Sequence, residues 1–316
     1  MNTIEVNNLT KKFDDFTSVN NISFDVKEGE VFGFLGSNGA GKSTTIKMLC
    51  GILSPTSGDA NVGGFSIRDN PDMVKRNIGY MSQKFSLYND LTVTENINFF
   101  GGVYGLKNRI LNERKKKVLE MSDLFEKENT LTSSLAVGYK QRLALGCAVI
   151  HEPKIVFLDE PTGGVDPISR RKFWDLINEL SEKGTTVFVT THYLDEAEFC
   201  NRIILIDEGR LIADGNPDEL KNQYIKNPVI EINCDNIYKA IEILEQESDT
   251  GSITIFGNAL HVTLKDSDGA EPGKYIEQIK ELIETKTNVK INRIERIAPS
   301  LEDVFIHLLD KKSAGV

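Results

Sequence analysis

The sequence has few of the features that membrane-spanning or disulfide-bonded proteins require. Its 316 residues contain no run of about 18 apolar residues, and Met1-Asn2-Thr3 does not open a signal peptide. We therefore expect no membrane span, so that a separate subunit would do the spanning if the protein acts at a membrane. The cysteines have no C-x-x-C pair and no histidine at metal-ligand spacing, which favours reduced core thiols in a cytosolic protein over disulfides or zinc. They are Cys50, Cys147, Cys200 and Cys234.

Positive charge is also scarce. Lys and Arg number 37 against 47 Asp and Glu, which gives a formal net charge of −10. This balance argues against a nucleic-acid surface as the main function, and we expect no nucleic-acid partner. The best local basic patch, Arg114-Lys115-Lys116-Lys117, is more simply interpreted as a solvated helix face. The length and a hydrophobic content of 40% fit one large domain or two of ordinary size.

What the sequence does contain is a complete phosphate-binding loop. Gly36-Ser37-Asn38-Gly39-Ala40-Gly41-Lys42-Ser43 fills every fixed position of the pattern G-x-x-x-x-G-K-[ST]. It lies between a short apolar run, Val31 to Leu35, and an apolar helical pattern, Lys42 to Cys50. A strand would thus lead into a glycine turn whose backbone N–H groups face an anion at a helix N-terminus; an ordinary glycine-rich turn is the weaker alternative. We predict that the chain binds a nucleoside triphosphate, with Lys42 reaching the β and γ phosphates and Ser43 offering its hydroxyl to Mg²⁺.

Two carboxylates follow a second apolar run. Asp159 and Glu160 end the expected strand that begins at Lys154. A carboxylate at the carboxyl end of a parallel strand, beside the strand that carries the phosphate loop, is where a Mg²⁺ ligand should lie. The adjacent carboxylate can polarise the water that attacks the γ phosphate. Such a pair could instead be a solvated turn or a helix cap, but its combination with the phosphate loop favours catalysis.

Two further polar residues follow apolar runs. His192 comes after Thr190-Thr191, where it could donate to the γ phosphate or to the attacking water, although a single histidine is usually structural. Gln83 follows the run Ile78 to Met81 and could ligate Mg²⁺ or position water; by itself it carries almost no signal.

Together these motifs resemble the nucleotide-binding subunit of an ABC transporter over residues 2 to about 220. The resemblance implies that residues 36–44, Thr44 included, bind ATP and that Phe13 stacks on adenine. Gln83 matches the Q-loop, Asp159 and Glu160 match the Walker B pair, and His192 matches the switch histidine. Gly163-Gly164-Val165-Asp166 matches the D-loop. The family implies ATP hydrolysis with Mg²⁺ in a head-to-tail dimer, each nucleotide lying between one subunit's phosphate loop and the other's signature motif.

The signature motif departs from the family pattern. The usual L-S-G-G-Q reads Leu135-Ala136-Val137-Gly138-Tyr139 here. The serine hydroxyl that contacts the γ phosphate in trans is missing at Ala136, whereas Gly138 and the helix N-terminus behind it can still supply main-chain donors. Loss of one such donor can cost roughly 3 kcal/mol of transition-state stabilisation, so we expect slower hydrolysis, not inactivity. Alternatively, the chain pairs with a different ATPase subunit and forms one weak composite site.

The fold implied is an α/β P-loop NTPase of the ABC ATPase type over residues 1–222. It has an antiparallel β subdomain at its start and a helical subdomain at about 90–150, where Leu111, Val118, Met121, Leu124 and Phe125 recur at helical spacing. A polar stretch from Asn222 to Pro228 precedes a second domain at 228–316, whose pattern βαββαβ predicts a small ferredoxin-like α+β fold. We expect that domain to be regulatory or dimerising.

The segments Leu135 to Asp166 and Pro299 to Phe305 resemble ATPases paired with ABC-2-type permeases, many of which are exporters. We therefore expect an ATPase that drives export from the cytoplasmic face of a membrane, docked on a separate permease. The stretch Phe85, Leu87 and Tyr88 would help to form the groove for a permease helix, or would simply pack the helical subdomain. The alternatives are a soluble ABC ATPase acting on ribosomes or DNA and an ATP-sensing regulator. The transported substrate is not encoded in this chain.

Overall fold

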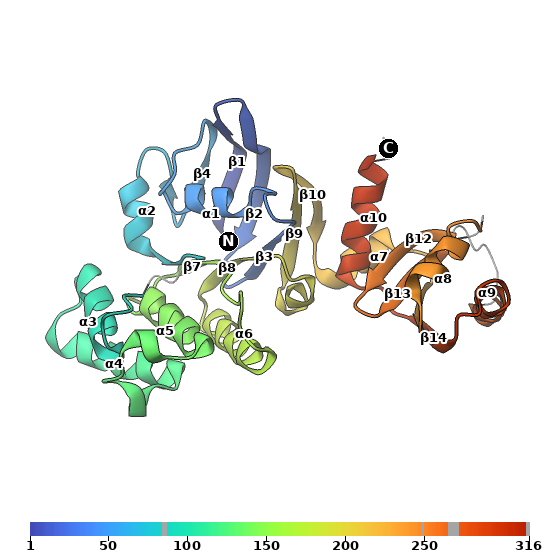
Figure 1. Cartoon of the computed structure of the whole chain (residues 1–316). Coiled ribbons are helices and arrows are strands. Elements are labelled where there is room, and N and C mark those ends of the chain that lie inside the picture. Colours follow the sequence, from blue (N-terminus) through green and yellow to red (C-terminus); the bar gives the residue numbers. More distant parts are fainter. Residues whose placement is uncertain (84–86, 248–249, 265–271, 314–316) are drawn as a thin grey trace. The chain divides into compact units, whose positions relative to one another are not determined.

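The computed structural model describes residues 1–83, 87–247, 250–264 and 272–313. The chain divides into two compact units, Met1–Asn216 and Pro217–Val316 (Figure 1). Within the described residues, no helix combines the length and the apolar character needed to cross a bilayer. The four cysteines are buried free thiols.

A six-stranded sheet forms the centre of the first unit, in the order β10-β9-β3-β8-β7-β6. Five of the strands, from β9 to β6 in this order, run parallel to one another, and β10 pairs antiparallel with β9. Every residue of β3, β7 and β8 is buried, as parallel strands covered on both faces should be. Because these strands are parallel, their carboxyl ends lie at one edge of the sheet. The strands are β3 (Val31–Leu35), β6 (Ile78–Met81), β7 (Ile155–Asp159), β8 (Thr186–Thr191), β9 (Arg202–Asp207) and β10 (Arg210–Gly215).

A second sheet, antiparallel throughout, has the order β2-β1-β4-β5. Register shifts interrupt the polar–apolar alternation of its first two strands without ending their pairing. Asn8 and Asn21 adopt positive φ at these irregularities. The strands are β1 (Asn2–Phe13), β2 (Phe16–Lys27), β4 (Ser57–Val62) and β5 (Phe65–Ser66).

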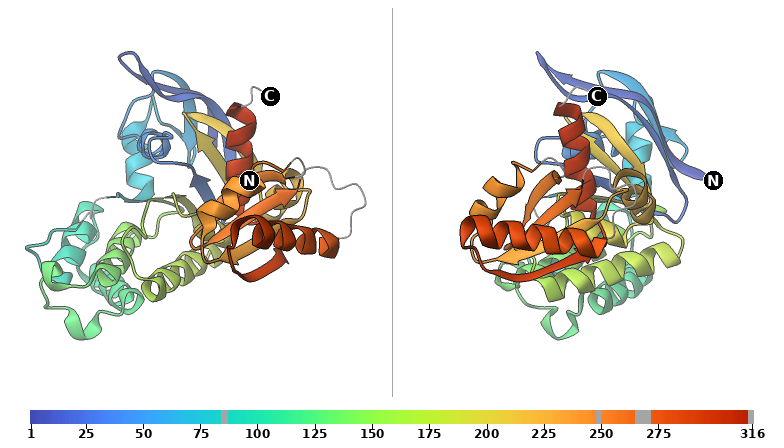
Figure 2. Two further views of the ribbon diagram at one scale, coloured as in Figure 1. Left: turned by 45° about the vertical axis from the view of Figure 1, so that its right-hand side comes forward. Right: turned by 90° about the vertical axis from the view of Figure 1, so that its right-hand side faces the viewer.

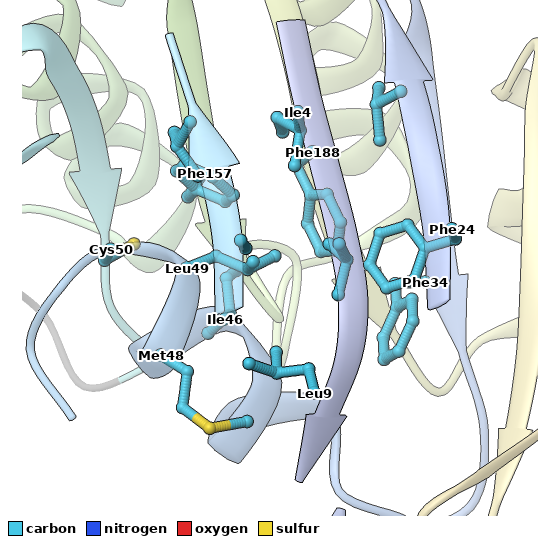
Figure 3. Packing of buried hydrophobic residues seen from close by; sticks show 14 of the residues in the cluster. Ile4, Leu9, Phe24, Phe34, Ile46, Met48, Leu49, Cys50, Phe157 and Phe188 are labelled. Carbon is cyan, nitrogen blue, oxygen red and sulfur yellow. The ribbon is translucent and has the colours of Figure 1, made fainter. Parts of the chain in front are cut away.

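Helix α1 (Lys42–Leu49) packs into a hydrophobic core shared by the two sheets. Figure 3 shows Ile46 and Leu49 of this helix near Phe157 of β7, with side chains of β1 and β2 alongside. The Phe188 ring lies 5.5 Å from the Phe34 ring and 5.4 Å from the Phe157 ring, so the aromatic side chains tie three strands together. This packing fixes both the strand and the helix that flank the phosphate loop.

The remaining helices of the first unit are mostly α-helices with short 3₁₀ turns between them, and α3, α4 and α5 contact one another (Figure 1). One sequence prediction needs correction here. Helix α4 ends at Ser122, because Asp123 adopts a left-handed conformation with φ 58, so Leu124 and Phe125 do not continue it. The helices are α2 (Pro71–Asn77), α3 (Val93–Val103), α4 (Asn108–Ser122), α5 (Val137–Val149), α6 (Pro167–Glu182), η1 (Phe125–Lys127), η2 (Thr132–Ser134) and η3 (Leu194–Phe199).

The second unit contains an antiparallel sheet with the order β12-β13-β11-β14. Helices α8 and α9 pack side by side against it around a second hydrophobic core (Figure 2). This arrangement confirms the predicted ferredoxin-like βαββαβ fold. The elements are α7 (Pro217–Tyr224), β11 (Val229–Cys234), α8 (Ile237–Leu244), β12 (Thr250–Phe256), β13 (Ala259–Leu264), α9 (Pro272–Thr287), β14 (Ile291–Ile297) and α10 (Leu301–Ser313).

The segment before α10 attaches that helix to the sheet. Asp303 accepts hydrogen bonds from the backbone N–H and the hydroxyl of Ser300, each at 2.7 Å. Its other oxygen lies 3.0 Å from Nδ1 of the buried His261 on β13. The polar residues that follow Pro299 therefore cap the helix and fix its position within the second unit.

Candidate active site

The phosphate loop joins β3 to α1 as the sequence predicts. Ser37, Asn38 and Gly39 are exposed, whereas Ala40 is buried beneath them. Gly41 has a φ of 107, and a Cβ there would lie 2.5 Å from the carbonyl oxygen of Ser18. Only glycine fits this position, so the loop keeps the tight turn that aims its backbone N–H groups outward from the helix start.

Lys42 lies inside this loop with only 4% of its side chain exposed. Its ammonium donates to the carbonyl oxygens of Gly36 (2.8 Å) and Ser37 (3.0 Å), and lies 3.5 Å from Oε1 of Glu160. Burial lowers the pKa of Lys42, and the carboxylate of Glu160 opposes that shift. The loop therefore holds a positive charge at its centre before any phosphate arrives.

Ser43, Asp159 and Thr190 form a group of oxygen atoms beside the loop. Oδ1 of Asp159 accepts hydrogen bonds from the hydroxyls of Ser43 (3.0 Å) and Thr190 (2.8 Å). Burial raises the pKa of Asp159, which is 1% exposed, and the two hydroxyl bonds oppose the rise. A hydroxyl and a carboxylate are hard oxygen ligands that suit Mg²⁺, which usually takes only one or two protein ligands beside phosphate and water. Ser43 and Asp159 thus fit this ion.

Three residues named from the sequence meet at the carboxylate of Glu160. Nε2 of Gln83 donates to Oε2 at 2.9 Å, Nδ1 of His192 lies 3.3 Å from the same oxygen, and Lys42 approaches Oε1. Glu160 has a φ of 48, which is unusual for a residue with a side chain. Its backbone N–H donates to the hydroxyl of Thr190 at 3.0 Å. The loop after β7 is therefore held in a strained conformation by β8.

Thr190 is a residue whose role the sequence analysis missed. It is fully buried on β8, and its hydroxyl both donates to Asp159 and accepts from the backbone of Glu160. Its sequence signal, a hydroxyl inside an apolar strand two residues before His192, is too common to identify such a role.

The signature residues lie at the start of α5. Leu135 is buried, Ala136 is the exposed N-cap residue, and Val137 is 40% exposed. Gly138 packs so closely on α6 that a Cβ would lie 2.6 Å from the hydroxyl of Ser169. The Tyr139 ring stacks on the guanidinium of Arg142, at 4.7 Å.

The D-loop lies next to the signature residues. Asp166 is the N-cap of α6 and accepts a hydrogen bond from the backbone N–H of Ser169 at 3.0 Å. Because Gly138 contacts the same Ser169, the starts of α5 and α6 are in direct contact.

Phe13 lies at the end of β1, where its ring is 44% exposed and the Lys11 ammonium lies 5.1 Å above it. Thr44 accepts a hydrogen bond from the hydroxyl of Ser18. For the groove after Gln83, Phe85 lies outside the described residues and Leu87 is buried. The roles given to these residues stay predictions.

Tyr88 is 45% exposed and its ring packs edge-on against Phe99 at 4.7 Å.

In the basic segment, Arg114 and Lys117 both form ion pairs with Glu152, and Nζ of Lys117 lies 3.2 Å from Oε1 of Glu152. Lys117 is exposed, as a solvated helix face predicts, whereas the side chain of Arg114 is only 22% exposed.

Comparison with known proteins agrees with this arrangement. Residues 19–163 match the ABC transporter family, and residues 215–309 match the C-terminal domain of DrrA1-3-like ATP-binding proteins. The Escherichia coli K12 protein "Probable multidrug ABC transporter ATP-binding protein YbhF" is 54% identical over 220 residues, which cover 70% of this chain and 38% of that protein. This chain therefore spans less than half the length of that relative.

Two other relatives are similar along most of their length. A solved ATP-binding cassette, a dimer in a post-hydrolysis state with ADP and Pi, is 28% identical with a TM-score of 0.62, covering 67% of this chain and 98% of that one. The linearmycin resistance ATP-binding protein LnrL of Bacillus subtilis 168 is 34% identical over 308 residues, covering 96% of this chain and 97% of the relative. With the motif geometry described above, this similarity shows that the chain belongs to the ABC transporter family, among its ATP-binding proteins.

Proposed function

We propose that this protein hydrolyses ATP to ADP and phosphate and that hydrolysis drives export through a separate membrane permease. The observation that carries the proposal is the convergence of Lys42, Gln83 and His192 on the carboxylate of Glu160. A general base, a phosphate-binding cation and two water-positioning groups are the parts that phosphoryl transfer to water needs. Residues 1–222 would be the ATPase domain and residues 228–316 an accessory domain.

In this proposal, each side chain has a distinct task. Lys42 exchanges its bonds to loop carbonyls for bonds to phosphate oxygens, and the loop N–H groups bind the same anion. Glu160 accepts a proton from the attacking water, while Gln83 and His192 orient that water or the γ phosphate. Ser43 and Asp159 would hold Mg²⁺, which neutralises phosphate charge when bound.

We propose further that two subunits form each complete site. Val137 and the N-cap Ala136 are exposed at the start of α5, where backbone N–H groups are available to a phosphate bound by another chain. The similarity to a cassette solved as a dimer supports this arrangement. The missing hydroxyl at Ala136 favours slow hydrolysis in a homodimer or a partner subunit with an intact motif.

The proposals of a permease partner and of export are based on the names of similar proteins. YbhF is named for multidrug transport and LnrL for linearmycin resistance. We propose that the permease is of the ABC-2 type and holds this protein at the cytoplasmic face of the membrane. The exposed rings of Tyr88 and Phe99 offer an apolar contact for a permease helix.

The direct test is the variant Glu160→Gln, which keeps the size of the side chain and removes its basicity. We expect the steady-state rate of phosphate release to fall at least about a hundredfold while ATP binding persists, because the phosphate loop is untouched. ATP should also trap the variant as a dimer in size-exclusion chromatography. Glu126→Gln, on the exposed turn η1, is the matched control and should keep full activity. Unchanged hydrolysis by Glu160→Gln would remove Glu160 from this role.

A separate experiment tests the membrane partner. The protein is purified from detergent-solubilised membranes of its own cells, and the co-purifying integral protein is identified. Recovery of a protein with about six apolar spans of 20 residues supports the proposed permease. Recovery of the protein on ribosomes or DNA instead would favour a non-transport ABC ATPase.

A further inference from the structure

A second buried carboxylate lies close to the site described above. Glu196 belongs to the turn η3 (Leu194–Phe199), and none of its surface is exposed. Oε1 accepts a hydrogen bond from the hydroxyl of Thr162 at 2.5 Å, and Oε2 accepts one from the hydroxyl of Thr191 at 2.7 Å. Nε of Arg170 lies 3.4 Å from Oε1. Each oxygen of Glu196 is therefore bound by a different segment of the chain.

These partners come from the three segments that carry the predicted site residues. Thr162 is two residues after Glu160, and Thr191 directly precedes His192. Arg170 lies on α6, and its backbone N–H donates to the carbonyl of Asp166 at 2.9 Å. Glu196 thus joins the loop after β7, the end of β8 and the start of the helix that follows the D-loop.

Contacts of the Tyr193 ring reinforce the connection to His192. The guanidinium of Arg170 lies 4.4 Å from the centre of the Tyr193 ring, and that ring lies 4.1 Å from the ring of His192. The backbone N–H of Tyr193 also donates to the hydroxyl of Thr191 at 3.0 Å. The Thr191 hydroxyl that binds Glu196 therefore also sets the backbone on either side of His192.

Burial of this carboxylate opposes its ionisation. Burial raises the pKa of Glu196, while the hydroxyls of Thr162 and Thr191 and the charge of Arg170 lower it. A side chain of the same volume without charge would avoid the desolvation cost. A carboxylate here brings something an apolar residue cannot, since two acceptor oxygens can bind two hydroxyls that point from different strands.

We propose that Glu196 is a positioning residue for hydrolysis: its carboxylate fixes the loop that carries Glu160, the end of β8 that carries His192 and the start of α6 relative to one another. The inference rests on the proposed ATPase function. Within the described part of the chain, the hydrogen bonds and the ion pair of Glu196 go to Thr162, Thr191 and Arg170 and not to the phosphate loop, so it acts through the residues it holds. Its removal should reduce turnover and leave ATP binding largely intact.

Asp195 provides a matched control. It is the neighbouring residue, and Oδ2 also lies near Arg170, at 3.5 Å from Nη1, but its side chain is 72% exposed. Asp195→Asn removes one negative charge next to Arg170 without touching either threonine. Glu196→Gln removes the same charge from the buried position and replaces one acceptor oxygen with a donor.

The kinetic experiment compares these variants in the full chain. We expect Glu196→Gln to lower kcat about tenfold with the KM for ATP changed less than about threefold, and Asp195→Asn to stay within about twofold of the parent. In a His192→Ala background, Glu196→Gln should lower kcat less than it does in the parent background, because one of the residues it positions is gone while the loop that carries Glu160 is still affected. An equal loss in both backgrounds, or no loss in either, overturns the proposal.

The second measurement does not depend on activity. Hydrogen–deuterium exchange of the nucleotide-free protein should show amides of residues 160–166 and 190–193 exchanging about tenfold faster in Glu196→Gln and unchanged in Asp195→Asn. If Glu196→Gln unfolds, Thr191→Val should give the same acceleration and Thr191→Ser should restore the parent rate. Unchanged exchange overturns the proposal. If Glu196→Gln exchanges faster but the parent protein does not hydrolyse ATP, the proposed function is refuted. The conclusion that Glu196 holds the three segments together then still stands.

Discussion

The carboxylate cluster around Glu160 and the start of α5 are two halves of one proposed site, yet they are built in opposite ways. In the cluster, Lys42 and Asp159 are buried, and their charges and lone pairs are bound by groups of the same chain. At the start of α5, Ala136 and Val137 face outward without a side-chain hydroxyl. The first half is preorganised within one subunit, whereas the second half has main-chain donors that would face another subunit in the proposed dimer.

The difference also predicts how each half responds to substitution. Groups inside the cluster share partners, so the loss of one leaves another buried and unpaired. Groups at the start of α5 share few partners within the chain, so substitutions there should act mainly through the neighbouring helix or the second subunit.

The largest effect is expected for Lys42→Met. It removes the cation from the phosphate loop and leaves the carboxylate of Glu160 with one partner fewer. We expect hydrolysis to fall at least about a hundredfold and ATP binding to weaken strongly. Isothermal titration calorimetry with ATP and a phosphate-release assay measure both. Lys47→Met, on the exposed face of the same helix, should behave like the parent protein. Full ATP affinity in Lys42→Met would show that Lys42 does not contribute to nucleotide binding.

The next effect concerns the contact between α5 and α6. Gly138→Ala places a Cβ against Ser169, an overpacking that typically costs about 1–3 kcal/mol. We expect hydrolysis about tenfold slower, with partial recovery in the double variant Gly138→Ala/Ser169→Gly. Gly102→Ala is the control, because a Cβ on that helical glycine meets open space. Equal activity of Gly138→Ala and Gly102→Ala would mean that the spacing of α5 and α6 does not matter.

A smaller change, and a gain, is expected for Ala136→Ser. The added hydroxyl would supply the phosphate donor that the start of α5 lacks, and we expect hydrolysis to rise about threefold or more if the homodimer is the working form. Rates measured at several protein concentrations distinguish faster turnover from tighter dimerisation. An absence of gain would favour a heteromeric partner or a different geometry at this motif.

The smallest effect is one of stability. Burial raises the pKa of Asp159, so the folded protein disfavours its ionised form. The stability that the protonated group contributes at low pH is lost as the pH rises from the ordinary pKa of an aspartate through the raised folded pKa. Asp159→Asn should therefore raise the Tm of the nucleotide-free protein by about 2–4 °C at pH 8, and by less as the pH is lowered toward 4. Asp175→Asn, on the exposed side of α6, should leave the Tm unchanged at both pH values. A lower Tm for Asp159→Asn at pH 8 would contradict a destabilising charge.

Part of the fold can be predicted from local patterns of glycine and apolar residues in the sequence. The phosphate loop follows from glycine stereochemistry, and β3, β7 and β8 follow from short apolar runs that suit strands buried on both faces. The lengths of β1 and β2 do not follow from the pattern, because a bulge shifts the alternation of apolar residues by one position while the hydrogen-bonded ladder continues. The helical spacing that runs on to Leu124 and Phe125 also passes the end of α4, because the turn at Asp123 leaves that spacing unchanged.

The residues of the candidate site could likewise be predicted only in part. Positions at strand ends could be named from the sequence, since parallel strands bring their carboxyl ends together. Thr190 and Glu196 could not, because a threonine in an apolar strand and a glutamate after a histidine have no distinctive pattern. Each has a partner more than 25 residues away, which only the folded chain brings into contact.

The bonds of Lys42 connect phosphate binding with the proposed base. The ammonium is shared between two loop carbonyls and Glu160, so it partly neutralises that carboxylate. In the proposed mechanism, a triphosphate competes for the ammonium and thereby releases Glu160 to accept a proton from water. Binding of the nucleotide and activation of the base would then be a single event, so that the base becomes available only when a phosphate is in place.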